Sequence, residues 1–129
     1  MARVLVVEDN VSNMTLATFL LKSAGHSVLG ATDAEAGLTL ARAQRPELIL
    51  MDIQLPGMDG LEATALLKAD QVTRDIPVIA LTALAMKGDE ERIRAAGCDG
   101  YIAKPMRYQD FLAAVAMFLP PAPAPTTPE

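Results

Sequence analysis

The sequence predicts an α/β protein in which a parallel sheet is covered by helices on both faces. Short apolar runs alternate with longer stretches of helical periodicity, and this strand–helix pair recurs five times along the chain. Several runs, such as residues 48–51 and 78–81, are apolar at every position, which is typical of strands buried on both faces. A chain of 129 residues, of which 51% are hydrophobic, is long enough to bury one core without disulfides.

The strands are predicted from apolar runs bounded by turn residues. The runs "RVLVV", "ELILM" and "PVIAL" are strongly apolar, whereas "SVLGA" and "GYIA" are weaker or shorter. In chain order the strands are expected at residues 3–7, 27–31, 47–51, 77–81 and 100–103.

The first two helices are predicted from their periodicity and their end signals. Apolar residues recur at helical spacing across residues 14–24, and Gly25 follows as a stop signal. Thr32 and Glu35 form a T-x-x-E capping box, which predicts a second helix that begins there and reaches about Arg42.

The last three helices carry similar signals. Asp59 and Glu62 have cap spacing for a helix that ends near Lys68. Residues 88–97 place acids in the first turn and a glycine at the end, as the helix dipole favours. Residues 108–119 form the final helix. Its inward side chains are expected to be Phe111, Leu112 and Val115.

The C-terminal segment, "PPAPAPTTPE" at residues 120–129, cannot form a helix or a central strand, because its prolines lack the backbone N–H that either would use. We expect a disordered tail with polyproline character. The folded domain is therefore expected to span residues 1–119, with no repeat and no second domain.

The overall charge and composition exclude several classes of protein. The net charge is −5 and the basic residues are not clustered, so direct binding to nucleic acid is not expected. No apolar run approaches the roughly 18 residues that span a bilayer. The apolar run at the N-terminus is also too short for a signal peptide. The single cysteine, Cys98, fits a reducing compartment, so the predicted location is the cytoplasm.

Polar side chains follow four of the five predicted strands. In a doubly wound parallel sheet, ligands bind at the carboxyl ends of the strands. The residues expected to meet at this edge are Glu8, Asp9, Asp52, Thr82, Lys104 and Pro105.

Three carboxylates at one edge require a positive partner. Two carboxylates about 5 Å apart repel by about 3 kcal/mol at an effective dielectric near 20. Lys104 supplies one positive charge and a divalent cation would supply two more. Oxygen ligands without histidine or cysteine favour Mg²⁺ over zinc. A nucleophilic aspartate beside a lysine, a hydroxyl and Mg²⁺ is suited to phosphoryl transfer onto Asp52.

Four ordered motifs resemble those of the bacterial response-regulator receiver domain. They are "VLVVEDN", "LILMDIQLPGMDG", "PVIALTA" and "GYIAKP", and the resemblance extends to about Leu119. The stretch "TALAMKGDEERIRAAGCDGYIAKP" is similar to stand-alone receivers that regulate cell division. The resemblance implies a flavodoxin-like fold with a five-stranded parallel sheet in the order 2-1-3-4-5.

The resemblance also implies roles around a metal ion. Asp52 would be the phosphoacceptor and a metal ligand, Asp9 would bind Mg²⁺ directly, and Glu8 would bind it through water. The backbone carbonyl of Gln54 would complete the protein ligands. Glu8 departs from the commoner double-aspartate form, which could alter the water-mediated contact. Gln54 and Leu84 are expected to tune the access of water to the phosphoaspartate.

The remaining implied roles concern switching. Thr82 would hydrogen-bond the phosphoryl group, and Lys104 would pair with Asp52 or its phosphate. The Lys104–Pro105 peptide would be cis. Tyr101 occupies the position of the family's switch aromatic.

The function implied is that of a stand-alone response regulator. A sensor histidine kinase or a histidine phosphotransfer protein would donate the phosphoryl group to Asp52. A downstream protein effector would then bind the surface formed by the fourth helix, the fifth strand and the fifth helix. The chain would not be an enzyme beyond catalysing its own phosphorylation and dephosphorylation.

Two alternatives remain open at the level of sequence. A haloacid-dehalogenase-like phosphatase also uses a nucleophilic aspartate, but it needs a D-x-D-x-T arrangement after its first strand. Here Asp52 follows the third strand and is succeeded by Ile53, Gln54 and Leu55. The second alternative is a receiver that is never phosphorylated and acts only as a binding module.

Overall fold

The computed structural model describes residues 2–83 and 87–119, and these form a three-layer α/β structure. Its elements follow one another as β1 (Arg3–Val7), α1 (Val11–Ser23), β2 (Ser27–Ala31), α2 (Ala34–Gln44), β3 (Leu48–Asp52), α3 (Gly60–Ala69), β4 (Val78–Thr82), α4 (Lys87–Ala95), β5 (Gly100–Ala103) and α5 (Tyr108–Phe118). The predicted tail at residues 120–129 and Leu84 lie outside the described residues.

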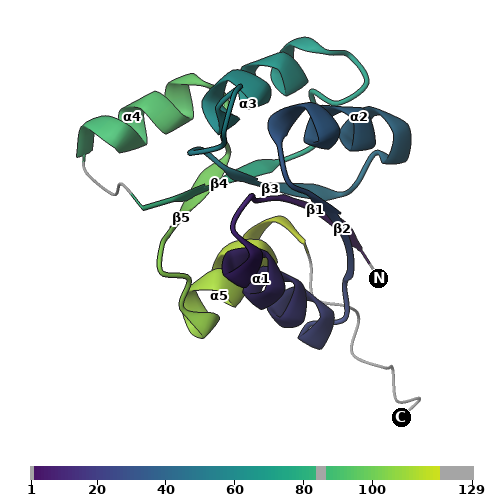
Figure 1. Ribbon diagram of the computed structural model, residues 1–129, viewed down its shortest axis with the longest axis vertical. Helices are drawn as coiled ribbons and strands as arrows, with labels where there is room; N and C mark the ends of the chain where they lie inside the picture. The colour runs from purple at the N-terminus through teal and green to yellow at the C-terminus, as the bar shows by residue number, and fades with distance from the viewer. Residues whose placement is uncertain (1, 84–86, 120–129) are drawn as a thin grey trace.

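All neighbouring strands pair in parallel, in the order β2-β1-β3-β4-β5, which confirms the predicted fold class. Helices α1 and α5 cover one face of the sheet, and α2, α3 and α4 cover the other (Figure 1). None of the helices in residues 2–83 and 87–119 is both long enough and apolar enough to cross a lipid bilayer.

The central strands are apolar throughout because each face of the sheet has its own core. In β1, Leu5 and Val7 belong to the core under α2 and α3, whereas Val4 and Val6 belong to the core under α1 and α5. All five residues of β3 and all five of β4 are buried. The alternation of side chains along a strand therefore supplies apolar residues to both cores.

The caps of the helices agree with the sequence signals in one case and differ in another. Asp59 caps α3 as predicted, since its Oδ1 accepts the N–H of Glu62 at 2.8 Å. The prediction that Thr32 caps the second helix is wrong. Asp33 is the cap: its backbone is extended and its Oδ1 accepts the N–H of Ala36 at 2.8 Å. The helix also continues past Arg42 and ends at Gln44.

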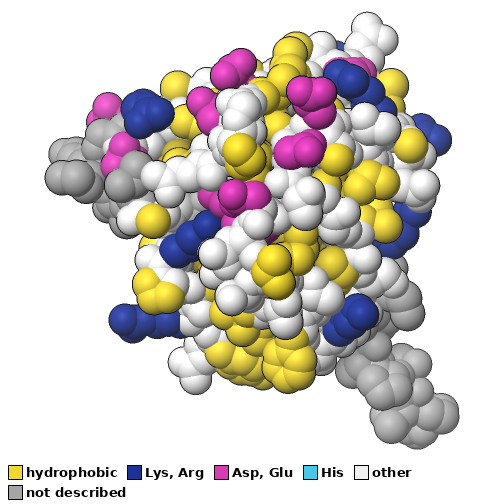
Figure 2. All heavy atoms as spheres, viewed as in Figure 1, with side chains coloured by type: hydrophobic (Ala, Val, Ile, Leu, Met, Phe, Trp, Pro, Cys, Tyr) yellow, Lys and Arg dark blue, Asp and Glu magenta, His cyan; other side chains and the backbone are white. Residues whose placement is uncertain are grey.

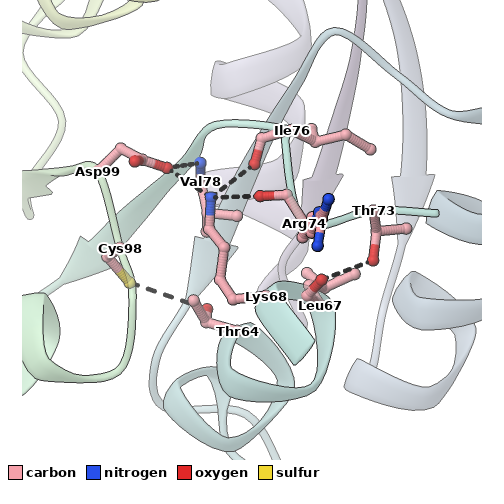
Figure 3. Close-up of polar contacts among 9 residues, drawn as sticks. All are labelled: Thr64, Leu67, Lys68, Thr73, Arg74, Ile76, Val78, Cys98 and Asp99. Atoms are coloured by element: carbon pink, nitrogen blue, oxygen red, sulfur yellow. Dashed lines mark hydrogen bonds and ion pairs between the residues drawn. The ribbon is translucent and has the colours of Figure 1, made fainter. Parts of the chain in front are cut away.

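Lys68 forms polar contacts at the amino-terminal ends of β4 and β5, at the end of the sheet opposite the predicted site (Figure 3). This cluster, the lysine clasp, consists of Lys68, Ile76, Val78 and Asp99. The Lys68 ammonium, at the end of α3, donates to the carbonyl of Ile76 and to Asp99 Oδ2, both at 2.9 Å. The same Asp99 oxygen accepts the N–H of Val78 at 2.8 Å. Gly97 has a φ of 105°, and a Cβ there would lie 2.8 Å from Lys68 Cγ, so the clasp requires glycine. The clasp ties the starts of β4 and β5 together, and so aligns their carboxyl ends.

Candidate functional site

Three carboxylates meet at the carboxyl end of the sheet. Val7 of β1 pairs in register with Met51 of β3, so the residues that follow them, Glu8 and Asp52, are neighbours. Oxygen atoms of Glu8, Asp9 and Asp52 lie within 4.8 Å of one another. Glu8 and Asp52 are buried, with 1% and 2% of their surface exposed, whereas Asp9 is exposed. Figure 2 shows acidic side chains gathered near the middle of this face.

Lys104 lies between the two buried carboxylates. Its Nζ is 2.9 Å from Glu8 Oε1 and 3.1 Å from Asp52 Oδ2. The backbone N–H of Lys104 donates to the carbonyl of Thr82 at 2.7 Å, which fixes the start of the loop after β5. The Lys104–Pro105 peptide that follows is cis.

Backbone N–H groups occupy the other carboxylate oxygens. Asp52 Oδ1 accepts the N–H of Gln54 at 2.9 Å, and Glu8 Oε2 accepts the N–H of Asn10 at 3.1 Å. Each buried carboxylate thus has one oxygen bound to a backbone N–H and one at ion-pair distance from Lys104, and Glu8 Oε1 accepts no hydrogen bond from the described residues. This arrangement orients both groups before any ligand arrives.

The loop after β3 passes close to the site because of Gly60. The N–H of Gly60 donates to the carbonyl of Ile53 at 3.2 Å, which closes the loop. A Cβ at Gly60 would collide with the backbone oxygen of Asp52 and would lie 2.7 Å from the Cα of Ile53. The loop can fold this tightly against the carboxyl end of β3 only because residue 60 has no side chain.

The electrostatics of the site follow from burial and crowding. Burial, followed by the hydrogen-bonding interaction with Asp52, raises the pKa of Glu8 to about 7, although Lys104 acts in the opposite direction. Burial alone would lower the pKa of Lys104, but its close contacts with the Glu8 and Asp52 carboxylates outweigh that effect, and the pKa is raised. Lys104 is therefore a permanent positive charge in the site.

The raised pKa of Glu8 predicts how the stability of the metal-free protein depends on pH. The folded state binds the Glu8 proton more tightly than the unfolded chain does, so this contribution is complete below pH 4.5 and is lost as the pH rises through 7. The shift corresponds to up to about 3 kcal/mol. Between pH 5 and 8, the wild type should lose unfolding free energy relative to the Glu8→Gln variant, which mimics the neutral carboxyl group.

Denaturant unfolding of both proteins in the presence of a chelator measures this difference. If the difference in unfolding free energy between wild type and Glu8→Gln is the same at pH 5 and pH 8, the pKa of Glu8 is not raised. The same conclusion follows if the wild type becomes more stable relative to the variant as the pH rises.

The donor set fits a hard divalent cation. All three carboxylates offer oxygen, and the described part of the chain brings no histidine or cysteine into this group. Oxygen ligands of this kind suit Mg²⁺. Asp9 leaves the group open to solvent, because it is the exposed member.

The two predicted switch residues lie on adjacent strands. Thr82 is the last residue of β4 and is fully buried; it pairs in register with Ala103 of β5. Tyr101 is half-buried on β5 and packs against the core under α2 and α3. Asp52 pairs in register with Leu81, the residue before Thr82, and Tyr101 pairs with Ala80 on the other side of β4.

Sequence reasoning missed two features of the site. It paired Lys104 with Asp52 but not with Glu8, although the extra methylene of glutamate could have indicated a longer reach. It also did not identify Gly60, whose position in "LPGMDG" directly before an apolar helix was a possible signal of close backbone approach.

The comparisons with known proteins agree with this geometry. The family model described as the response regulator receiver domain matches residues 4–116. The polar-differentiation response regulator DivK of Brucella anthropi is 50% identical over 116 residues, which are 90% of this chain and 94% of that protein. DivK of Brucella ovis is 49% identical over the same length. The predicted resemblance to the response-regulator receiver domain is thereby confirmed, and DivK is among the relatives of this chain.

Solved structures show the same fold. The chemotaxis protein CheY4 of Vibrio cholerae superimposes with a TM-score of 0.88 at 27% identity, covering 92% of this chain and 99% of that one. The receiver domain of a sensor histidine kinase from Pseudomonas aeruginosa has a TM-score of 0.84 at 37% identity, covering 91% and 96%. That structure has a magnesium ion coordinated in its active-site cleft. On its sequence, its fold and its cluster of acidic residues, this chain belongs to the response-regulator receiver family.

Proposed function

We propose that the chain is a single-domain phosphorylation switch of a two-component phosphorelay. Its Asp52 receives a phosphoryl group from the phosphohistidine of a donor protein. The observation that carries the proposal is the buried Asp52 carboxylate, which lies 3.1 Å from the Lys104 ammonium and beside two further acids. The match to 94% of the length of DivK supports a single-domain relative of that regulator.

The residues suggest how the transfer would proceed. An Asp52 oxygen forms a bond to phosphorus while the bond between phosphorus and the histidine nitrogen breaks, and the nitrogen keeps the electron pair. The Lys104 ammonium neutralises a phosphoryl oxygen as the imidazole leaves. Bound Mg²⁺ would supply the remaining positive charge. Asp9, Asp52 and the carbonyl of Gln54 would hold it directly, and Glu8 would do so through water.

The output would come from the strands beside Asp52. Phosphorylation adds close to one further negative charge and new acceptor oxygens. The Thr82 hydroxyl would turn toward these oxygens, and the Tyr101 ring would move inward into the space released. The surface of α4, β5 and α5 would then bind a downstream protein in one state better than in the other.

The donor would dock on α1, which carries an apolar patch next to the site. The patch consists of Val11, Leu16 and Phe19, which are 80%, 37% and 66% exposed. In Figure 2, hydrophobic side chains gather in the lower part of the molecule, where α1 lies in the same view in Figure 1. Because α1 begins two residues after Asp9, an apolar helix packed on the patch would bring its histidine close to Asp52.

A cytoplasmic location belongs to the same proposal, since Cys98 is a free thiol.

Incubation with Mg²⁺ and acetyl phosphate, followed by intact-mass measurement, tests the proposal. The expected result is one added phosphoryl group per chain, and none when a chelator replaces Mg²⁺. A phosphatase of the haloacid-dehalogenase type would instead release many equivalents of phosphate from phosphomonoesters. A mass that never changes would favour the binding module that is not phosphorylated.

We expect the Thr82→Ala variant to separate phosphorylation from its output. Asp52, Asp9 and Lys104 remain, so the variant should still accept phosphate. Beryllium trifluoride, which mimics the phosphoryl group, should shift the backbone NMR signals of β5 and α5 strongly in wild type and by less than about half as much in the variant.

The control for this experiment is Thr39→Ala, which removes an exposed hydroxyl on α2. It should behave as wild type. Equal shifts in wild type and Thr82→Ala would mean that Thr82 is not the coupling residue.

A further inference from the structure

One side of α3 connects Asp52 with the segment that leads into β5. Gly60, Thr64 and Lys68 are four residues apart, so they lie along the same side of the helix. The Thr64 hydroxyl donates to the carbonyl of Gly60 at 2.8 Å, and the Lys68 ammonium lies 2.9 Å from Asp99 Oδ2. Figure 3 shows Thr64 and Lys68 directed toward Cys98 and Asp99. We call Gly60, Thr64 and Lys68 the α3 stripe.

The first residue of the α3 stripe packs against the backbone of Asp52. A Cβ at Gly60 would collide with the Asp52 carbonyl oxygen, and the N–H of Gly60 donates to the carbonyl of Ile53 at 3.2 Å. The loop between these residues contains Gln54, whose N–H donates to Asp52 Oδ1 at 2.9 Å. A change in the bonding of the Asp52 side chain therefore acts on a loop that closes onto the start of α3.

The far part of the α3 stripe packs against residues 97–99. Cys98 Sγ donates to Thr64 Oγ1 at 3.8 Å, and both residues are buried. A Cβ at Gly97 would lie 2.8 Å from Lys68 Cγ, so the stem of the lysine rests directly on the backbone there. Asp99 Oδ2 accepts from the Lys68 ammonium within the lysine clasp. A shift of the stripe must therefore move this segment or break these contacts.

We propose that α3 carries the state of Asp52 to the start of β5, and that Lys68 is the positioning residue through which Asp99 follows the helix. This rests on the proposed function, since it concerns how phosphorylation of Asp52 is transmitted. From Gly60 to Lys68 an α-helix rises about 12 Å. The backbone hydrogen bonds of the helix keep it rigid over that length, so a displacement of its first turn reaches its last turn.

This route is separate from the one through Thr82. Thr82 ends β4, and its carbonyl accepts the N–H of Lys104 at 2.7 Å, so it acts on the carboxyl end of β5. The α3 stripe acts on Asp99, directly before the amino-terminal end of β5. The backbone amides of Cys98 and Asp99 therefore report on the stripe.

The changes in backbone amide NMR shift that saturating beryllium trifluoride and Mg²⁺ induce at Cys98 and Asp99 separate the two routes. In Thr82→Ala, these amides should keep at least about two thirds of the wild-type change, because the stripe is intact. In Lys68→Met, which removes the ammonium but keeps a long stem, they should lose at least about two thirds of it.

The control is Arg42→Met. Arg42 Nε lies 2.9 Å from Asp70 Oδ2, so this variant also breaks an ion pair at the end of α3, but on the side of α2. The mimic should change the shifts of Cys98 and Asp99 in this variant as much as in wild type.

Three results would overturn the inference. The first is a change at Cys98 and Asp99 that is as large in Lys68→Met as in wild type, which would make the lysine clasp purely structural. The second is the loss of this change in Thr82→Ala, which would place the signal in β4. The third is a wild type in which residues beside Asp52 respond to the mimic while Cys98 and Asp99 do not. The proposed function would then stand without the route through α3.

Thr64→Val takes the place of Lys68→Met if that variant does not fold. Valine has about the same shape as threonine but cannot bond to Gly60 or Cys98, so the change in shift at Cys98 should fall to about half of the wild-type value. An unchanged value would contradict the route. Failure of the proposed function looks different: the wild type would show no response to the mimic even beside Asp52, and both proposals would be wrong.

Discussion

The Asp52→Asn variant should accept no phosphoryl group under conditions in which the wild-type chain accepts one. Asp52 is buried at the end of β3, with one oxygen held by the N–H of Gln54 and the other beside Lys104. An amide at this position retains the shape of the side chain but lacks the nucleophilic carboxylate. Intact-mass measurement after treatment with acetyl phosphate and Mg²⁺ should show complete loss of the added phosphoryl mass.

The matched control is Asp59→Asn. Asp59 caps α3 through the N–H of Glu62, and asparagine caps helices about as well as aspartate. This variant should therefore fold and be phosphorylated as wild type. Peptide mapping of the phosphorylated wild type completes the experiment: a phosphoryl group found on Asp9 or Asp59 would overturn the assignment of the acceptor.

The strands could be predicted from the sequence because their residues supply both cores of one sheet. β1, β3 and β4 are apolar at consecutive positions, and each lies under helices on both faces. The order of the strands needed the family resemblance, because an alternation of strands and helices allows several sheet orders. The cap of α2 could not be chosen from the sequence, since Thr32 and Asp33 are both good capping residues and the backbone angles decide between them.

The meeting of the site's side chains at one end of the sheet could be predicted, and so could the contact of Lys104 with Asp52, but the contact of Lys104 with Glu8 could not. Glu8, Asp52, Thr82 and Lys104 each follow or end a strand, and parallel strands bring those positions to one edge. The contact of Lys104 with Glu8 depends on the path of the loop after β5 and on the rotamer of a long side chain. The raised pKa of Glu8 depends on burial by residues distant in sequence.

Asp9→Ala should lower Mg²⁺ affinity and the rate of phosphorylation together. Asp9 is the exposed member of the acidic group, and its carboxylate lies within 4.8 Å of Glu8 and Asp52. Lys104 and backbone N–H groups already occupy the oxygens of those two acids. Asp9 is therefore the carboxylate best placed to bind a metal directly, and its loss should weaken Mg²⁺ binding by about 10- to 100-fold.

The coupling of the two losses is the decisive part of this prediction. If Asp9 acts through the metal, raising the Mg²⁺ concentration in proportion to the lost affinity should restore most of the phosphorylation rate. The control is Asp75→Ala, which removes an exposed carboxylate just before the amino-terminal end of β4, at the end of the sheet away from the site. It should change neither the Mg²⁺ affinity nor the rate of phosphorylation. Unchanged Mg²⁺ affinity in Asp9→Ala would contradict the metal site itself. A rate that stays low at saturating Mg²⁺ would instead mean that Asp9 contacts the phosphodonor and that the metal is held by the buried acids.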